Sequence, residues 1–357
     1  MTKPNLAGFL LAVAALCVGT DAAAQTFYAG KRLTILVGVD AGGTIDTLAR
    51  TFAAQLRKHI PGNPAIVVQN MPGAGSTIAT NHVYERAAPD GLTILYNSWD
   101  PLAQALGDQL LRARYDRFVY LGGTGDIRVI YARTDAVPGG IKAARDIVKA
   151  ESIILGALNK TDISGLLPKL ALQVLGIKHR MVVGYRGGQD VFLAMQRGEV
   201  QFHSTSISTF RSRNAAFVKS GDGIGIAYLV GVDRNGAYQK SQYINEMPAF
   251  PDLYREINGK PPSGPDWDAL NWLTSQIGEM TYVGFAPPGT PPAALAALRA
   301  GFEGASNDPE FVDDAIKRNG VPFTFVNVAR GQAIFRSLAD VTPEVLGTLR
   351  ASISAAN

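Results

Sequence analysis

The chain has 357 residues, of which 46% are hydrophobic and 18% are charged. This composition allows a substantial buried core, gives enough length for two lobes and excludes a disordered protein. The net charge is +4 and the isoelectric point is about 9.1, but lysine and arginine are dispersed rather than clustered. Because nucleic-acid binding requires a basic stripe and aromatic platforms, the sequence argues against a nucleic-acid partner.

Residues 1–24 have the pattern of a secretory signal peptide. Lys3 lies near the start, an apolar run covers residues 6–18, and Ala22 and Ala24 are the small residues that signal peptidase requires. We therefore expect cleavage after Ala24 and a periplasmic mature protein. The apolar run is shorter than the roughly 20 residues that span a bilayer.

The only cysteine, Cys17, lies inside this signal, which raises the alternative of a lipid anchor. The preceding Ala14-Ala15-Leu16 lacks the small residue that lipoprotein processing uses just before the cysteine. We therefore expect a mature chain without a thiol. Such a chain has no disulfide, no thiolate metal site and no cysteine nucleophile.

An apolar strand that starts at Leu33 runs into a Gly42-Gly43 turn and directly into an amphipathic helix. The apolar positions of that helix recur with a period of 3.6 residues, at Ile45, Leu48, Ala49, Phe52, Ala53 and Leu56. The first turn of such a helix directs free backbone N–H groups toward the glycines, which let an anion approach closely. The alternative is a tight connection that touches no ligand.

The same pattern of strand, polar turn and helix recurs along the chain. The predicted units are 65–69, 70–76 and 77–87, followed by a strand at 92–96; 152–156, 157–162 and a helix from Ile163; and 180–184, 185–188 and 189–197, followed by a strand at 199–203. Strands that alternate with helices predict parallel sheets. Two such units in each half predict an α/β fold with two doubly wound lobes, whose strand ends face one another across a central cleft.

The predicted lobe boundaries are 26–123 with 232–357 for lobe one, and 124–231 for lobe two. Within lobe one, the Pro- and Gly-rich stretch 233–268 is predicted to be a long irregular excursion. Beyond it, 280–286 predicts a strand, and proline-marked helix starts follow near Ala293 and Pro309.

Six short motifs occur in a specific order and spacing, although each is weak alone. They are Ala41-Gly-Gly-Thr-Ile-Asp46 with Ala49-Arg50, Gln69-Asn-Met-Pro-Gly-Ala-Gly75, Pro89-Asp-Gly91, Gly184-Tyr-Arg-Gly-Gly188, Arg197-Gly-Glu-Val200 and Ala286-Pro-Pro-Gly-Thr290. Together they resemble the substrate-binding receptors of tripartite tricarboxylate transporters, the Bug or TctC-like receptors, over essentially the whole mature length.

This resemblance implies a type II periplasmic binding protein fold. It implies a receptor that closes on a small organic carboxylate and delivers it to the subunits of a membrane permease. It also implies that the ligand carboxylates are held largely by backbone groups and waters of the Gly-Gly loop and its neighbours. Residues 247–252 only loosely match the Pro-rich segment of the family, so the resemblance does not define the ligand.

The candidate ligand-binding residues lie in the loops that follow the predicted strands. They are Ala41, Gly42, Gly43, Thr44, Asp46, Gly73, Ala74, Gly75, Ser76, Trp99, Thr161, Asp162, Tyr185, Arg186, Gly187, Gly188, Ser204 and Thr205. Asp46 either supports its turn and helix or binds an amino or hydroxyl group of the ligand. Arg186 either binds a carboxylate with its guanidinium or is an ordinary surface arginine.

The other candidates carry alternatives of the same kind. Asp162 is expected to cap the helix that follows it, and Trp99 either walls the cleft or packs in the core. The hydroxyls of Ser204 and Thr205 either bind the ligand or belong to a turn.

Enzyme signatures are incomplete. The segment that ends in Lys160 resembles a phosphate-binding loop, but Asn159 replaces its last glycine, and residues 73–78 lack the third glycine of a dinucleotide loop. No G-x-S-x-G elbow occurs, and the histidines are scattered singly at His59, His82, His179 and His203.

The sequence therefore predicts a monomeric periplasmic receptor without a cofactor, metal or catalytic residue. The alternatives are a secreted α/β enzyme that acts on a small carboxylate, and a receptor that signals to a membrane sensor and has no permease.

Overall fold

The structure is a computed structural model that describes residues 27–42, 44–233 and 235–354. The expected signal peptide, its cleavage site after Ala24, Cys17 and the candidate Gly43 lie outside the described residues. No helix within the described ranges has the length and apolar character that crossing a membrane requires.

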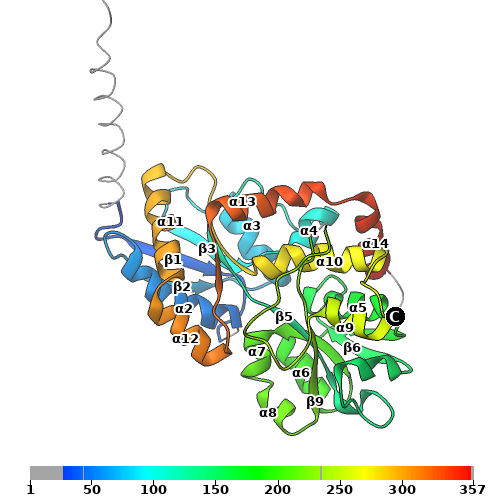
Figure 1. Cartoon of the computed structure of the whole chain (residues 1–357). Helices are drawn as coiled ribbons and strands as arrows, with labels where there is room; N and C mark the ends of the chain where they lie inside the picture. The colour runs from blue at the N-terminus through cyan, green and yellow to red at the C-terminus, as the bar shows by residue number, and fades with distance from the viewer. Residues whose placement is uncertain (1–26, 43, 234, 355–357) are drawn as a thin grey trace, which may run out of the picture.

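Two sheets organise the molecule (Figure 1). The first has the order β11-β4-β10-β3-β1-β2 and consists of β1 (Arg32–Val37), β2 (Ala65–Asn70), β3 (Thr93–Ser98), β4 (Val119–Gly125), β10 (Tyr282–Ala286) and β11 (Thr324–Val326). The second has the order β7-β6-β8-β5-β9 and consists of β5 (Arg128–Arg133), β6 (Ile153–Ala157), β7 (His179–Val183), β8 (Phe202–Ser206) and β9 (Gly223–Tyr228).

Strand direction follows the local connections. β1 pairs in parallel with β2 and β3, and β6 pairs in parallel with β7 and β8, because a helix returns the chain between these strands. The expectation of purely parallel sheets is wrong for β10, which lies antiparallel between β3 and β4, and for β5, which lies antiparallel to β8 and β9. These strands cross between the sheets, so no short helix fixes their direction. The α/β fold class itself is confirmed.

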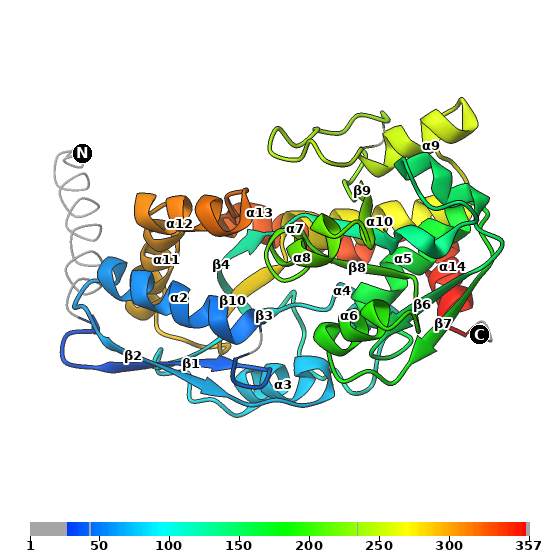
Figure 2. The same ribbon diagram turned by 90° about the horizontal axis from the view of Figure 1, so that it is seen from below.

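Helices cover both faces of the first sheet (Figures 1 and 2). One face holds α2 (Thr44–His59) and α11 (Pro292–Ser306), where the Phe52 ring stacks on Tyr96 with their centroids 5.3 Å apart. The other face holds α3 (Thr77–Glu85) and α13 (Val328–Ser337). The short α4 (Pro101–Leu106) follows β3, and α12 (Pro309–Asn319) follows α11.

The second sheet is covered in the same way. α5 (Ile163–Val174), α10 (Pro265–Glu279) and α14 (Pro343–Ser354) pack together on one side. The other side holds α6 (Gly188–Gln196), α7 (Ile207–Arg211) and α8 (Ala215–Lys219). The remaining elements are α9 (Phe250–Asn258) and the 3₁₀ turns η1 (Ala74–Ser76), η2 (Thr134–Ala136), η3 (Ala144–Lys149) and η4 (Leu338–Asp340).

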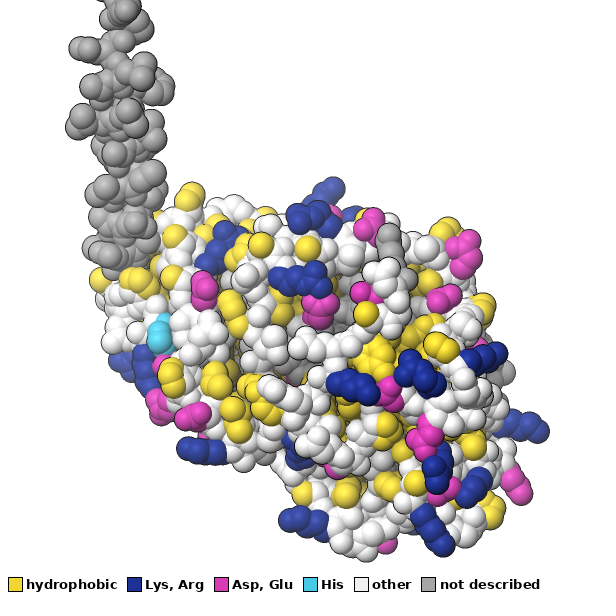
Figure 3. Space-filling view, viewed as in Figure 1, with side chains coloured by type: hydrophobic (Ala, Val, Ile, Leu, Met, Phe, Trp, Pro, Cys, Tyr) yellow, Lys and Arg dark blue, Asp and Glu magenta, His cyan; other side chains and the backbone are white. Residues whose placement is uncertain are grey.

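Charged side chains are spread over the surface of this fold. On the face shown in Figure 3, lysine and arginine side chains stand apart from one another and alternate with acidic and hydrophobic ones. Many of these charges form ion pairs across the surface, such as Arg145 with Glu256 at 2.8 Å and Arg330 with Glu279 at 2.6 Å. The positive net charge of the chain is therefore dispersed on this face.

The stretch 233–268 is less irregular than expected, since it contains α9 and the start of α10. Pro251 and Pro265 lie in the first turns of these helices, where a missing N–H costs nothing. Phe250 stacks on Trp267 with their centroids 6.2 Å apart. The prolines therefore mark helix starts, a role that the sequence prediction overlooked.

Helices from the range predicted for lobe one also pack on the second sheet. α10 packs against α5, and Leu349 of α14 is fully buried in the same core. The lobe boundaries at residues 124 and 232 stay a prediction.

The tight packing at Gly284 gives a test of the first sheet. A Cβ atom at this position would lie 2.2 Å from Cε1 of Phe302, a buried ring that also contacts Phe52. Gly284→Ala should therefore lower the free energy of unfolding by about 1–3 kcal/mol, measured by urea denaturation. The control is Gly347→Ala on the exposed side of α14, where a Cβ atom meets nothing within 4 Å and helix propensity favours alanine. Equal stability of the two variants would contradict the described packing.

Candidate functional site

The topology gathers the polar loops at one edge of each sheet. The loops that follow β1, β2 and β3 lead into α2, α3 and α4, so they share what we call the first strand-end edge. The loops that follow β6, β7 and β8 lead into α5, α6 and α7 and form the second strand-end edge. In open α/β sheets, ligands bind outside these carboxyl ends of the strands.

The two strand-end edges adjoin where the chain crosses between the sheets at residues 126–127. The Asp126 backbone N–H donates to Oγ1 of Thr281, which precedes β10, at 3.1 Å. Ser208 in α7 donates its hydroxyl to Oδ2 of Asp126 at 2.9 Å. One residue of the crossing therefore contacts both halves of the molecule.

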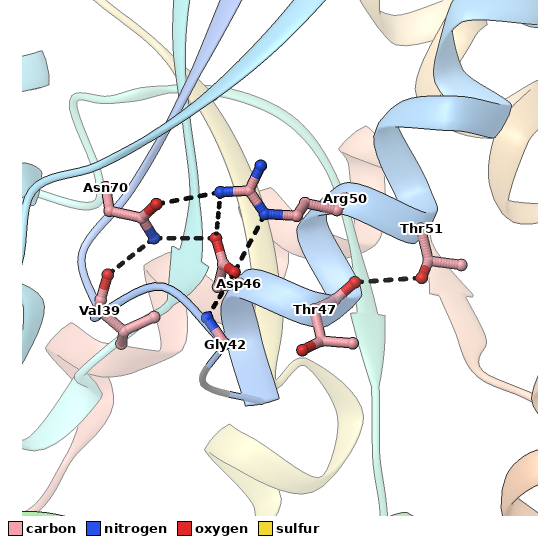
Figure 4. Close-up of polar contacts among 7 residues, drawn as sticks. All are labelled: Val39, Gly42, Asp46, Thr47, Arg50, Thr51 and Asn70. Atoms are coloured by element: carbon pink, nitrogen blue, oxygen red, sulfur yellow. Dashed lines mark hydrogen bonds and ion pairs between the residues drawn. The ribbon is translucent and has the colours of Figure 1, made fainter.

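A polar network braces the loop between β1 and α2 (Figure 4). Oδ2 of Asp46 accepts the Gly42 backbone N–H at 2.8 Å and Nε of Arg50 at 3.0 Å. Oδ1 of Asp46 accepts Nδ2 of Asn70 at 2.8 Å and lies 2.9 Å from Nη2 of Arg50. Asn70 also donates to the Val39 carbonyl at 2.9 Å, so the network joins this loop to the end of β2.

This network explains the role of Asp46. The hydrogen bond from Arg50, with those from Gly42 and Asn70, lowers the pKa of Asp46 to about 2, although burial opposes the shift. Both carboxylate oxygens already have partners, and the residue is only 2% exposed. The contacts fit the alternative in which Asp46 supports the turn. Exposed Ala41 and Gly42 lie at the outer side of this braced loop, and Thr44 begins α2.

The loop between β2 and α3 has an unusual backbone. Gly73, Ala74, Gly75 and Ser76 all have positive φ values, of 134°, 46°, 60° and 77°. Left-handed alanine and serine are uncommon and persist only where surrounding contacts hold them. Here the Ser76 hydroxyl donates to the Gly38 carbonyl at 3.1 Å, which ties the loop to the end of β1.

Trp99 belongs to the core rather than to an open wall. It is 2% exposed, its indole N–H donates to the Met280 carbonyl, and its ring packs edge-on against Tyr115 and Phe335. This placement fits the packing alternative.

The loops of the second strand-end edge are also joined. The Gly184 N–H donates to the Leu158 carbonyl at 3.1 Å. Asp162 caps α5 as predicted, accepting the Ser164 N–H at 3.3 Å and the Ser164 hydroxyl at 2.6 Å. The neighbouring Thr161 is exposed and donates its hydroxyl to the Asn159 side chain.

The loop after β7 presents one aromatic and one charged side chain. Tyr185 is partly buried and its ring lies against Gly156, where a Cβ atom would come within 3.2 Å of it. Arg186 is 93% exposed at the side chain and pairs with Asp190 at 3.3 Å. The structure therefore places Arg186 in solvent, which fits the alternative of an ordinary surface arginine.

The hydroxyl residues of β8 lie within the strand, not after it as predicted. β8 extends to Ser206, so Ser204 is fully buried and Thr205 is partly buried. Oγ of Ser204 has no hydrogen-bond partner within the described part of the chain. Burial lowers the pKa of the neighbouring His203 to about 4, so this histidine is neutral at pH 7.

The helix N-termini at the two edges fall into two classes. Asp100, Asp162 and Ser206 cap α4, α5 and α7 with their own side chains. The N-cap residues of α3 and α6, Ser76 and Gly187, make no side-chain cap. An N-terminus without a side-chain cap keeps partial positive charge. The Thr77 N–H that opens α3 already donates to the Ala74 carbonyl of the preceding η1 turn. Among the helices whose N-cap residue is described, α3 on the first edge and α6 on the second lack a side-chain cap, and Gly188 begins α6.

Two charged residues at the crossing were missed from the sequence, Asp126 and Arg128. Asp126 is 3% exposed, and burial raises its pKa to about 6, against the hydrogen bond from Ser208 and the charge of Arg128. The segment Asp126-Ile-Arg128 precedes the apolar Val129-Ile-Tyr-Ala132. Two charges at the entrance of an apolar strand were the available signal.

Hollows and metal clusters add little to this site. A surface hollow of about 460 Å³ lies beside α3 and touches the candidate Ala74. Another, of about 410 Å³, is lined by residues that include Val232, Tyr238 and Trp267. Among the residues that the structure describes, no group of three His, Cys, Asp or Glu side chains could hold a metal ion.

The Asp46 network gives a stability prediction. Because Asn cannot accept all four donors, Asp46→Asn should lower the free energy of unfolding at pH 7 by about 1–3 kcal/mol, measured by urea denaturation. The folded-state pKa lies below the unfolded value of about 3.9, so the contribution is present above pH 4 and lost as the pH falls toward 2. The exposed Asp40→Asn is the control. Equal stability of both variants would contradict the bracing role.

Asp126 gives a prediction of opposite sign. Its folded-state pKa lies above the unfolded value of about 3.9, so stability falls as the pH rises from about 4 to about 6. Asp126→Asn keeps an acceptor for Ser208. The change that it causes in the free energy of unfolding should be more favourable at pH 7 than at pH 4, by about 1–3 kcal/mol. Thermal melts at both values test this, with the exposed Asp340→Asn as control. The same change at both values would argue against a buried charge.

Comparison with known proteins adds to this geometry. No protein-family model matches the chain. A UPF0065 protein of Bordetella pertussis is 26% identical over 320 residues, which cover 87% of this chain and 86% of that relative. Protein BugT of the same organism is 36% identical over 102 residues, which cover 27% of this chain and 30% of BugT.

Solved structures share the fold over nearly the whole chain. The periplasmic binding protein BugD has a TM-score of 0.64 at 21% identity and covers 91% of this chain and 98% of its own. MatC from Rhodopseudomonas palustris with bound malate has a TM-score of 0.62 at 20% identity, covering 90% and 99%. A TctC solute-binding protein from Polaromonas has a TM-score of 0.57 at 19% identity, covering 88% and 99%. The chain is therefore similar in sequence to a UPF0065 protein and to BugT, and it shares the fold of BugD, MatC and a TctC solute-binding protein.

Proposed function

We propose that this protein is a periplasmic receptor that binds a small organic carboxylate between its two strand-end edges. The observation that carries the proposal is the pair of uncapped helix N-termini, of α3 on the first edge and α6 on the second. The partial positive charge of both ends suits an anionic group approached from two sides. Binding of this kind needs no covalent chemistry.

The loops around these N-termini fit the same proposal. The braced Gly42 loop and the left-handed residues 73–76 are held by buried contacts to Asp46 and Gly38. A loop held rigid before binding costs less entropy when the ligand arrives. The fold neighbour MatC has malate bound, which supports a small carboxylate as the ligand class here.

The partner and location are part of the proposal. By analogy with the receptor family that its motifs resemble, the protein would deliver its ligand to a tripartite tricarboxylate-type membrane permease after export by the predicted signal at residues 1–24. Co-purification with the subunits of such a permease is the test that separates transport from signalling.

A thermal-shift panel tests ligand binding. Succinate, malate, adipate and aromatic acids are compared with the corresponding neutral amides, because the proposed contacts require a negative charge. A ligand at ~100 times its dissociation constant should stabilise the folded protein by about 2.7 kcal/mol and raise its melting temperature. If no acid shifts the melting temperature of folded, ligand-free protein, carboxylate binding is wrong.

A matched pair of glycine variants tests the place of binding. Gly187 has a φ of −169°, which any residue adopts, and a Cβ atom there meets nothing within 4 Å. Gly187→Val should therefore fold normally but place a side chain over the N-terminus of α6 and weaken binding of the acid found in the panel by 10-fold or more. Gly347→Val, on exposed helix α14, should leave binding unchanged. Wild-type affinity in Gly187→Val would remove α6 from the site.

A further inference from the structure

Arg128 stands at the junction of the two strand-end edges. It is the first residue of β5 and pairs with Ser206, the last residue of β8. Because this pairing is antiparallel, the start of β5 lies beside the carboxyl end of β8, at the edge where α7 begins. Gly125, the last residue of β4, is only three positions away, so the arginine is also close to the first sheet.

The charge of Arg128 reaches residues of both sheets. It lowers the pKa of Asp126 at the crossing, where burial is the dominant and opposing effect. It also opposes the strong rise that burial causes in the pKa of Tyr282, the first residue of β10. The guanidinium therefore lies within electrostatic range of both edges.

Arg128 has no ion pair within the described part of the chain, although it is partly buried. Arginines with an ion pair are Arg50, Arg112, Arg114, Arg133, Arg145, Arg186, Arg197, Arg211, Arg255 and Arg330. Arg299 is partly buried and unpaired, but its guanidinium donates twice to the Tyr120 carbonyl. Arg128 is also partly buried, and its Nε atom is fully buried with no hydrogen-bond partner in the described chain.

Such an arrangement is costly unless a partner arrives. A buried donor without an acceptor costs about 1–3 kcal/mol, and more when it is charged. The neighbouring Asp126 does not satisfy Arg128, because its Oδ2 accepts from Ser208 and its Oδ1 has no partner among the described residues. A guanidinium offers a planar fork of donors that matches the two oxygens of a carboxylate.

We propose that Arg128 binds a carboxylate of the ligand directly and is the residue that selects anionic over neutral ligands. This assignment rests on the proposed receptor function and adds to it. The resemblance implies ligand carboxylates held largely by backbone groups and waters, whereas Arg128 supplies a full positive charge. The ligand is then a carboxylic acid ionised at neutral pH, and a neutral amide of the same shape is rejected.

Calorimetry with two variants tests the proposal. Arg128→Met keeps the apolar stem and removes the charge, and Arg128→Lys keeps the charge but loses the fork. The probes are succinate, malate and adipate, each with its neutral diamide. For the best-bound acid, Arg128→Met should lose roughly 10- to 100-fold in affinity and Arg128→Lys less, because charge-assisted hydrogen bonds are lost. The control is Arg350→Met, which removes an exposed arginine of α14 away from both edges and should leave affinity unchanged.

The ratio of the affinities for the acid and its diamide separates ligand binding from a structural role. The wild type should prefer the diacid, and Arg128→Met should lose that preference. The melting temperature of Arg128→Met without ligand should not fall, since the variant removes a buried Nε that has no hydrogen-bond partner among the described residues. An unchanged ratio in folded Arg128→Met, or a fall in its melting temperature without a change in ratio, overturns the assignment. If the wild type binds none of the acids, the proposed receptor function fails as well.

Discussion

The site depends on one topological constraint, the short crossing of the chain between the two sheets. β4 ends at Gly125 and β5 begins at Arg128, so the sheets cannot separate at this point by more than the reach of two residues. β10 then returns to lie antiparallel between β3 and β4, and its preceding Thr281 bonds to both Thr124 and Asp126. Together these contacts hold the carboxyl ends of strands from both sheets next to one another, and the polar loops follow.

Electrostatics then distinguishes the elements at these edges. The side chains of Asp100 and Asp162 cap the N-termini of α4 and α5. Burial raises the pKa of Asp100 to about 6, and the charge of Asp162, which follows a strand of the other sheet, contributes to the rise to a smaller extent. The N-termini of α3 and α6 have no side-chain cap. In the proposed receptor, a negatively charged ligand would be favoured near the N-termini that lack a side-chain cap and disfavoured near the acid-capped ones.

Polar groups that are hydrogen-bonded inside the protein have a different role in this structure from buried polar groups that lack partners. Asp46 and Asn70 have their hydrogen bonds inside the protein, so they shape a loop and leave little capacity for a ligand. Ser204 and Arg128 have buried polar atoms without partners among the described residues; Ser204 lies inside β8, and Arg128 lies beside the carboxyl end of that strand. Folding tolerates such atoms most readily where another molecule supplies the missing hydrogen bonds.

The sequence by itself determined the local units. Apolar periodicity, glycine turns and a capping aspartate defined the helices from Thr44 and Ile163 and the parallel strands around them, because these signals act over a few residues. Three outcomes became visible only in the folded structure. β10 lies between β3 and β4, and β8 extends through Ser204. Arg128 is partly buried beside the candidate site, whereas Arg186 is exposed. Those outcomes come from pairing between strands far apart in the chain, such as Arg128 with Ser206, and no local pattern encodes which distant strand a segment will join.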